Sequence, residues 1–130
     1  MKLLLDTHIW LWCLLTPEQL RPDVVDALSS AENELYLSPI SIWEALILAE
    51  KGRLKLGMDG DAWIDEALHA APMLEAPLTR AIARESRRLV LPNQDPADRF
   101  IIATAKVRGL TLVTADRHLL ASGAVAFLPN

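Results

Sequence analysis

Residues 95–116 read DPADRFIIATAKVRGLTLVTAD, which predicts a helix followed directly by a strand. Asp95 can cap the helix, Pro96 suits its first position, and Gly109 is a typical left-handed stop. The short apolar run Leu110–Thr114 then suits a buried strand. A helix that returns into a buried strand is typical of proteins with a parallel sheet.

The same alternation of strands and helices extends toward both ends of the chain. Apolar runs at Lys2–Leu5, Leu35–Leu37 and Val125–Leu128 predict three further short strands. Helices are predicted over residues 8–15, 22–29, 39–51, 62–70, 78–89 and 96–108. Strands separated by helical crossovers predict an α/β fold with a mainly parallel central sheet. In such sheets ligands bind at the carboxyl ends of the strands.

Composition narrows the class of protein. The chain has 130 residues, of which 52% are hydrophobic and 23% charged, so we expect a single domain over residues 1–130. Its one cysteine, Cys13, excludes an internal disulfide and a cysteine-rich zinc site, which favours a cytoplasmic protein. Asp6 and His8 interrupt the apolar start, so it is not a typical signal peptide. No stretch approaches the ~20 apolar residues of a membrane span.

Four acidic residues occupy comparable places in the predicted fold. Asp6 and Asp116 follow strands, whereas Glu44 lies in the second turn of one helix and Asp98 in the first turn of another. A parallel sheet would gather all four at one edge, where carboxylates without cysteine or histidine suit Mg²⁺ or Mn²⁺. The net charge of −4 argues against a broad basic surface for nucleic acid, but acids clustered around metal ions would give the same total.

Each acid also has a purely structural interpretation. Asp6 and Asp116 could be helix caps, and Asp95 and Asp98 stand at the spacing of a capping box. Glu44 is harder to explain in this way, because it lies between apolar residues and a buried carboxylate needs a partner or a metal.

Four segments resemble the conserved blocks of PIN-domain proteins, and more narrowly the VapC-type toxins of bacterial toxin–antitoxin pairs. These segments are LLLDTHIWLW, SPISIWEALIL, DPADRFIIATA and TLVTADRHLL. The resemblance covers nearly the whole chain, and the third block followed by LVTAD is its most specific part. It implies a three-layer α/β/α PIN-like fold.

The resemblance also implies an activity, namely a metal-dependent endoribonuclease that hydrolyses tRNA, rRNA or mRNA with Mg²⁺ or Mn²⁺. Thr114 would orient a carboxylate or a water, and Asp95 matches a less central acid. Glu44 would ligate the metal or orient the attacking water. The acids assigned to metal binding and catalysis are Asp6, Glu44, Asp98 and Asp116.

Partners follow from the same resemblance: a homodimer, and a cognate antitoxin whose tail lies over the early helices. Trp10 and Trp12 cannot share a helix face, and the tryptophans could pack in the core or line an apolar groove for the antitoxin. The pair Asn93-Gln94 departs from the His-Arg pair expected in many relatives, which puts substrate choice in doubt but not the acid set.

Basic residues beside the acids are candidates for contacts with RNA, although a solvated rim explains them as well. These are Arg99, Arg117, His118, Lys51 and Arg53. The alternative function is a non-catalytic PIN module that acts as an RNA-binding or protein-interaction scaffold, which the intact set of acids disfavours. A phosphoryl-transfer hydrolase would need a second Asp where His8 stands.

Overall fold

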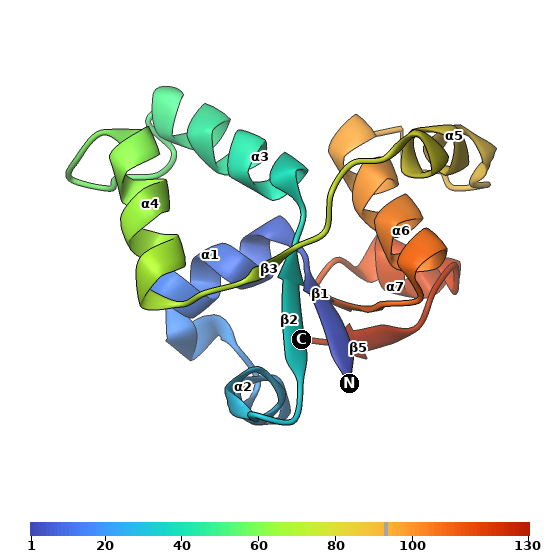
Figure 1. Cartoon of the computed structure of the whole chain (residues 1–130), viewed down its shortest axis with the longest axis horizontal. Coiled ribbons are helices and arrows are strands. Elements are labelled where there is room, and N and C mark those ends of the chain that lie inside the picture. Colours follow the sequence, from blue (N-terminus) through green and yellow to red (C-terminus); the bar gives the residue numbers. More distant parts are fainter. Residues whose placement is uncertain (93) are drawn as a thin grey trace.

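The computed structural model describes residues 1–92 and 94–130, in which a twisted sheet lies between two groups of helices (Figure 1). The strands are β1 (Lys2–Leu5), β2 (Glu34–Leu37), β3 (Leu74–Glu75), β4 (Thr111–Thr114) and β5 (Phe127–Pro129). Their order in the sheet is β3-β2-β1-β4-β5, and each neighbouring pair is parallel. The prediction of a parallel α/β sheet is therefore confirmed.

The helices that the structure describes are α1 (Thr7–Leu15), α2 (Pro22–Ser29), α3 (Pro39–Glu50), α4 (Gly60–Ala70), α5 (Arg80–Arg88), α6 (Pro96–Arg108) and α7 (Arg117–Ser122), with a 3₁₀ turn at Pro17–Gln19. All the α-helices except α2 begin after a short polar residue whose side chain caps the first turn. Side chains of Asp6, Ser38, Asp95 and Asp116 accept hydrogen bonds from the first turns of α1, α3, α6 and α7. Gly109 ends α6 with a φ of 65°.

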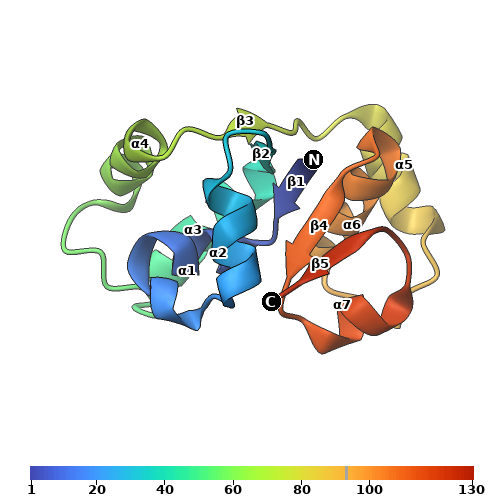
Figure 2. The same ribbon diagram turned by 90° about the horizontal axis from the view of Figure 1, so that it is seen from below.

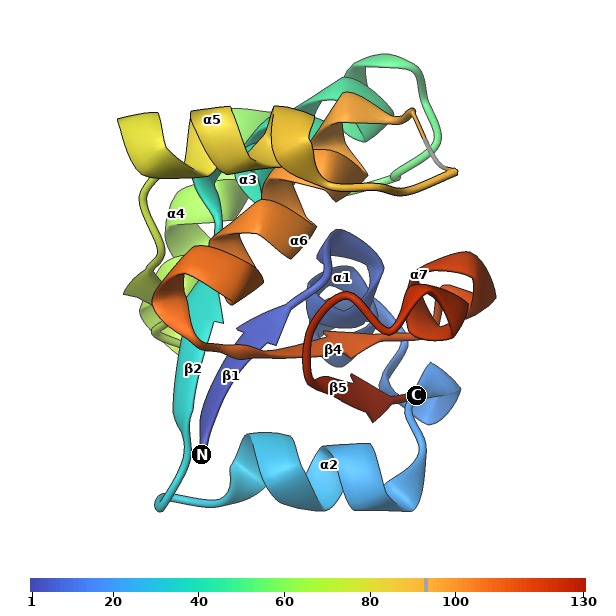
Figure 3. The same ribbon diagram turned by 90° about the vertical axis from the view of Figure 1, so that its right-hand side faces the viewer.

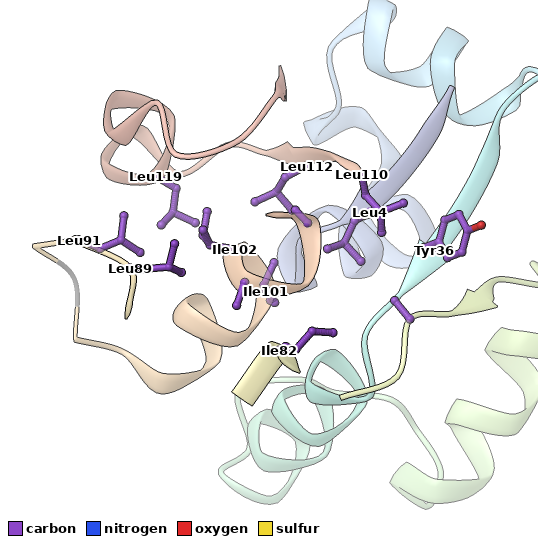
Figure 4. Close-up of a cluster of buried hydrophobic side chains, with 13 residues drawn as sticks. Leu4, Tyr36, Ile82, Leu89, Leu91, Ile101, Ile102, Leu110, Leu112 and Leu119 are labelled. Carbon is purple, nitrogen blue, oxygen red and sulfur yellow. The ribbon is translucent and has the colours of Figure 1, made fainter. Parts of the chain in front are cut away.

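Side chains alternate across the sheet and build a core on each face. Leu4 and Leu112 pack with Ile82, Ile101 and neighbouring apolar residues beneath α5 and α6, as Figure 4 shows. Adjacent strand residues, including Leu3, Leu5 and Val113, pack on the other face with residues of α1 to α4. Figure 2 shows the two helix groups on opposite sides of the strands. The three-layer α/β/α arrangement is confirmed.

Several details differ from the sequence prediction, including the additional short strand β3 at Leu74–Glu75. Helix α5 begins at Arg80 rather than Leu78, because Thr79 Oγ1 accepts a hydrogen bond from Ile82 N at 3.2 Å and caps the helix. The last strand is shifted to Phe127–Pro129. Helix α7 was not predicted as an element, although its cap Asp116 was. In the part of the chain that the structure describes, no helix is long and apolar enough to cross a membrane.

The strand order reverses at the centre of the sheet. From β1 the chain passes to β2 and β3 on one side, whereas β4 and β5 lie on the other. The carboxyl ends of β1 and β4 therefore form the switch point, where open α/β sheets bind their ligands. Asp6 directly follows β1, and Asp116 lies two residues after β4.

Candidate active site

An acidic cleft of about 380 Å³ opens at the carboxyl ends of β1 and β4. Five carboxylates from four parts of the chain line it, together with His8, Trp12 and Ala115. The five are Asp6, Glu44, Asp95, Asp98 and Asp116. The structure thus brings together the four acids singled out in the sequence and adds Asp95 to them.

Asp6 is the most deeply buried of these acids, with 7% of its surface exposed. Its Oδ1 accepts a hydrogen bond from Thr7 N at 2.8 Å, and its Oδ2 accepts one from Thr114 Oγ1 at 2.7 Å. Burial raises the pKa of Asp6, and the charge of Asp116 adds to the rise, while the two hydrogen bonds and His8 oppose it. Placing an ionised Asp6 here therefore costs free energy.

Glu44 projects from the second turn of α3 and is half-buried. The Thr7 hydroxyl donates a hydrogen bond to Glu44 Oε1, and the same hydroxyl lies 2.8 Å from Ser41 Oγ. Burial raises the pKa of Glu44, and the negative charges of Asp6 and Asp95 raise it further, against the Thr7 hydrogen bond. The cleft therefore concentrates negative charge that a cation would stabilise.

The remaining carboxylates combine capping with a place in the cleft. Asp116 Oδ1 accepts hydrogen bonds from His118 N at 2.8 Å and Leu119 N at 3.2 Å. Asp95 Oδ1 accepts one from Ala97 N at 3.0 Å. The capping interpretation of these acids is thus correct, yet both side chains also line the cleft. A cap and a site residue are not alternatives at these positions.

The donor chemistry of the cleft fits a hard divalent cation. Its carboxylate oxygens are the ligands that Mg²⁺ and Mn²⁺ prefer. Among residues 1–92 and 94–130, however, no group of three or more His, Cys, Asp or Glu side chains is arranged to hold a metal ion as it stands. The residues therefore fit the ion by their chemistry, and binding would require side-chain rearrangement.

Comparison with known proteins establishes the family. The PIN domain family model matches residues 3–123. This chain belongs to the PIN domain family. It is also similar to ribonuclease VapC22 of Mycobacterium tuberculosis, with 36% identity over 120 residues that cover 89% of this chain and 88% of the relative.

Solved structures support the fold of this PIN domain. VapBC2 from Rickettsia felis, bound to a DNA fragment from its promoter, matches with a TM-score of 0.71 at 16% identity. The match covers 99% of this chain and 98% of the other. DNA-bound VapBC from Salmonella typhimurium matches with a TM-score of 0.67 at 18% identity, over 99% and 98% of the two chains.

One predicted contact with RNA is wrong. Arg99 is only 4% exposed, and its guanidinium points away from solvent into the packing between α5 and α6. Its Nε donates to Ser86 O at 2.8 Å, and its Nη2 donates to Leu89 O at 2.6 Å. Carbonyls at the end of a helix lack helical partners and attract a cation, so this PIN domain uses Arg99 as a structural clamp.

The other basic candidates are exposed, as a contact with RNA requires. Arg117 and His118 lie in the first turn of α7 beside Asp116. Lys51 and Arg53 follow α3, and Arg53 also lines a second, mainly apolar groove of about 410 Å³. Contacts of these residues with RNA stay predictions. Of the unusual pair Asn93-Gln94, Asn93 lies outside the described residues.

His8 was missed as a site residue in the sequence. His8 and Trp12 line both the acidic cleft and the neighbouring groove, and their ring centroids are 6.0 Å apart. Their i, i+4 spacing directly after Asp6 was the available signal. As expected, Trp10 and Trp12 separate: Trp10 is buried and packs edge-to-face on Trp63.

Proposed function

We propose that this PIN domain is a divalent-metal-dependent endoribonuclease and the toxin of a toxin–antitoxin pair. The observation that carries the proposal is the cleft at the strand switch point, where five carboxylates converge. Such a set suits the hydrolysis of a phosphodiester and has no obvious use in a structural module. The similarity to a relative named as a ribonuclease supports the same activity.

Asp6, Asp98 and Asp116 are the proposed ligands of Mg²⁺ or Mn²⁺. A bound metal ion would polarise the phosphodiester and lower the pKa of an attacking water. Thr114 keeps one oxygen of Asp6 fixed by its hydrogen bond, so that this carboxylate needs little reordering. Asp95 caps α6 and thereby places the first turn that carries Asp98.

Glu44 is the proposed residue that ligates the metal or orients the water. Its pKa is raised by burial and by neighbouring charges, which moves it toward the range where a carboxylate exchanges protons efficiently. The Thr7 hydroxyl donates a hydrogen bond to one of its oxygens, and the Glu44 side chain lines the cleft.

The proposed partner is an antitoxin chain, since the similar structures include VapBC complexes. The apolar groove beside the acidic cleft suits one of its segments. Leu11, Trp12, Leu15, Leu48 and Leu54 line this groove. We expect the toxin to be a homodimer in the cytoplasm, where its RNA substrates occur.

The test is incubation of the purified protein, free of any partner, with total tRNA and with rRNA. Wild type in Mn²⁺ or Mg²⁺ is compared with wild type in EDTA and with Asp98→Asn. Glu50→Gln at the exposed end of α3 is the matched control. We expect wild type and the control to produce discrete RNA fragments, and only when metal is present. We expect none from Asp98→Asn. Cleavage by Asp98→Asn at the wild-type rate would refute the proposal, and the absence of both cleavage and metal binding would favour the scaffold alternative.

A further inference from the structure

Helix α5 carries the densest group of positive charge in the chain. Its nine residues, RAIARESRR, include four arginines in a protein whose net charge is −4. The four, Arg80, Arg84, Arg87 and Arg88, are all exposed, and we call them the arginine face. None of these residues was among the candidate contacts with RNA identified in the sequence.

Helical geometry places the arginines on one side of α5. At 3.6 residues per turn, the four positions fall within an arc of roughly 100°. Ile82 and Ser86 occupy the opposite side and are buried against the rest of the molecule. Figure 3 shows α5 lying along the outer side of α6, so that its far side is turned to solvent. The arginine face is therefore a continuous basic stripe.

The positive charge of this face is largely uncompensated. The one acid of the helix, Glu85, binds Lys106 Nζ at 2.8 Å and lies 3.9 Å from Arg88 Nη1. Within the described ranges 1–92 and 94–130, Arg80, Arg84 and Arg87 form no ion pair. Such an unpaired stripe of arginines is typical of a surface that binds a ligand with repeated negative charges.

The stripe is also connected to the acidic cleft. The Arg99 side chain reaches from the first turn of α6 to the carbonyls of Ser86 and Leu89 at the end of α5. The first turn of α6 also carries Asp98, which lines the cleft. One side chain thus spans the distance between the segment that carries Asp98 and the end of α5 that carries Arg87 and Arg88.

We propose that the arginine face binds the phosphate backbone of the RNA strand at nucleotides flanking the cleaved bond. This inference rests on the proposed ribonuclease function and identifies where the substrate is held. The acidic cleft repels phosphates, so a polyanionic substrate needs a cationic surface beside it to bind. Contacts with phosphates supply affinity and register without reading the base sequence.

The test measures the affinity for a fluorescein-labelled single-stranded oligoribonucleotide by anisotropy, as KCl is varied in EDTA buffer. Wild type is compared with Arg84→Gln/Arg87→Gln. The charge-matched control is Lys2→Gln/Arg21→Gln, whose exposed side chains lie on β1 and just before α2, away from the cleft. Each lost phosphate contact on a single strand reduces the slope of log K against log salt by about 0.7, so a decrease of about 1.4 is expected for the α5 variant alone.

A cleavage arm in Mn²⁺ separates this inference from the proposed function. For an RNA that wild type cleaves, we expect the KM of the α5 variant to be severalfold higher than that of wild type and its kcat to be unchanged. If wild type cleaves no RNA but its binding of the oligoribonucleotide still depends on α5, the proposed ribonuclease activity is refuted and the proposed role of the arginine face in RNA binding is retained. The inference would be overturned if the salt dependence of binding had the same slope in wild type and the α5 variant. It would also be overturned if the α5 variant and the control lost the same affinity for RNA. Either result would favour an acidic protein as the partner of the arginine face.

Discussion

Thr114 Oγ1 donates a hydrogen bond to Asp6 Oδ2 at 2.7 Å, although the two residues stand 108 positions apart. The bond joins the ends of the parallel neighbours β1 and β4 at the point where the strand order reverses. Thr114 Oγ1 also accepts a hydrogen bond from Asp116 N at 3.1 Å. One hydroxyl therefore fixes a buried carboxylate and the backbone of a second cleft residue.

Removal of the Thr114 hydroxyl is expected to reduce metal binding and cleavage more than it reduces the stability of the fold. In Thr114→Val the buried Asp6 oxygen loses its donor, so that the carboxylate is less well oriented toward a metal. Loss of a hydrogen-bond donor that orients a metal ligand typically lowers metal affinity or activity by about 10–100-fold. Cleavage rates and Mn²⁺ affinity measure the effect, and Thr114→Ser, which keeps the hydroxyl, is the control. An unchanged rate for Thr114→Val would show that the bond does not contribute to the site.

Arg99 is expected to contribute to stability rather than to the binding of RNA. Arg99→Met fills much of the same volume but leaves the carbonyls of Ser86 and Leu89 without the guanidinium. Loss of buried charged hydrogen bonds of this type costs on the order of 2–4 kcal/mol. Urea unfolding of Arg99→Met measures this loss, and Arg117→Met on the exposed turn of α7 is the control. Equal stabilities of the two variants would contradict the clamp.

Glu44 is expected to reduce stability at neutral pH when metal is absent. Its pKa in the folded protein lies above its ordinary value of 4.5, because burial disfavours the charged form. The folded state therefore binds the proton more tightly than the unfolded state, and the cost grows as pH rises from about 4.5 through the folded pKa. In EDTA at neutral pH, Glu44→Gln should raise Tm on the order of 2 °C.

The pH dependence gives this prediction its control. The difference in Tm between Glu44→Gln and wild type should shrink as the pH falls below the ordinary pKa of 4.5, where Glu44 becomes protonated in both states. Glu50→Gln, at the exposed end of α3, should show no such trend. Saturating Mn²⁺ should stabilise wild type more than Glu44→Gln, since a ligand of the folded state adds stability by mass action. A lower Tm for Glu44→Gln in EDTA at neutral pH would contradict the account.

The sequence predicted where the acidic residues lie in the fold better than it predicted which way the side chains next to them point. Asp6 and Asp116 follow short apolar strands, and a parallel sheet brings the ends of such strands together whatever the details of packing. Arg99 was misassigned because it is adjacent to Asp98 in sequence, yet successive residues of a helix point about 100° apart. One therefore faces the cleft, whereas the other enters the core.

The arginine face shows a second limit on prediction from sequence. The spacing of its arginines is visible in RAIARESRR, but which side of the helix is free depends on tertiary packing. Burial of Ile82 and Ser86 settles that point. His8 was overlooked for a similar reason: its place in the cleft follows from the direction in which α1 leaves β1, which no local pattern specifies.

The central claim is that the acidic cleft binds a divalent metal, and calorimetric titration with Mn²⁺ at neutral pH tests it most directly. Wild type and Glu50→Gln should bind Mn²⁺ alike, whereas Asp6→Asn and Asp98→Asn should bind at least tenfold more weakly while remaining folded by circular dichroism. Binding should weaken as the pH is lowered, because protons compete with Mn²⁺ for Asp6 and Glu44, whose pKa values burial raises. Absence of binding by wild type, or equal binding by the Asp98→Asn variant, would contradict the account.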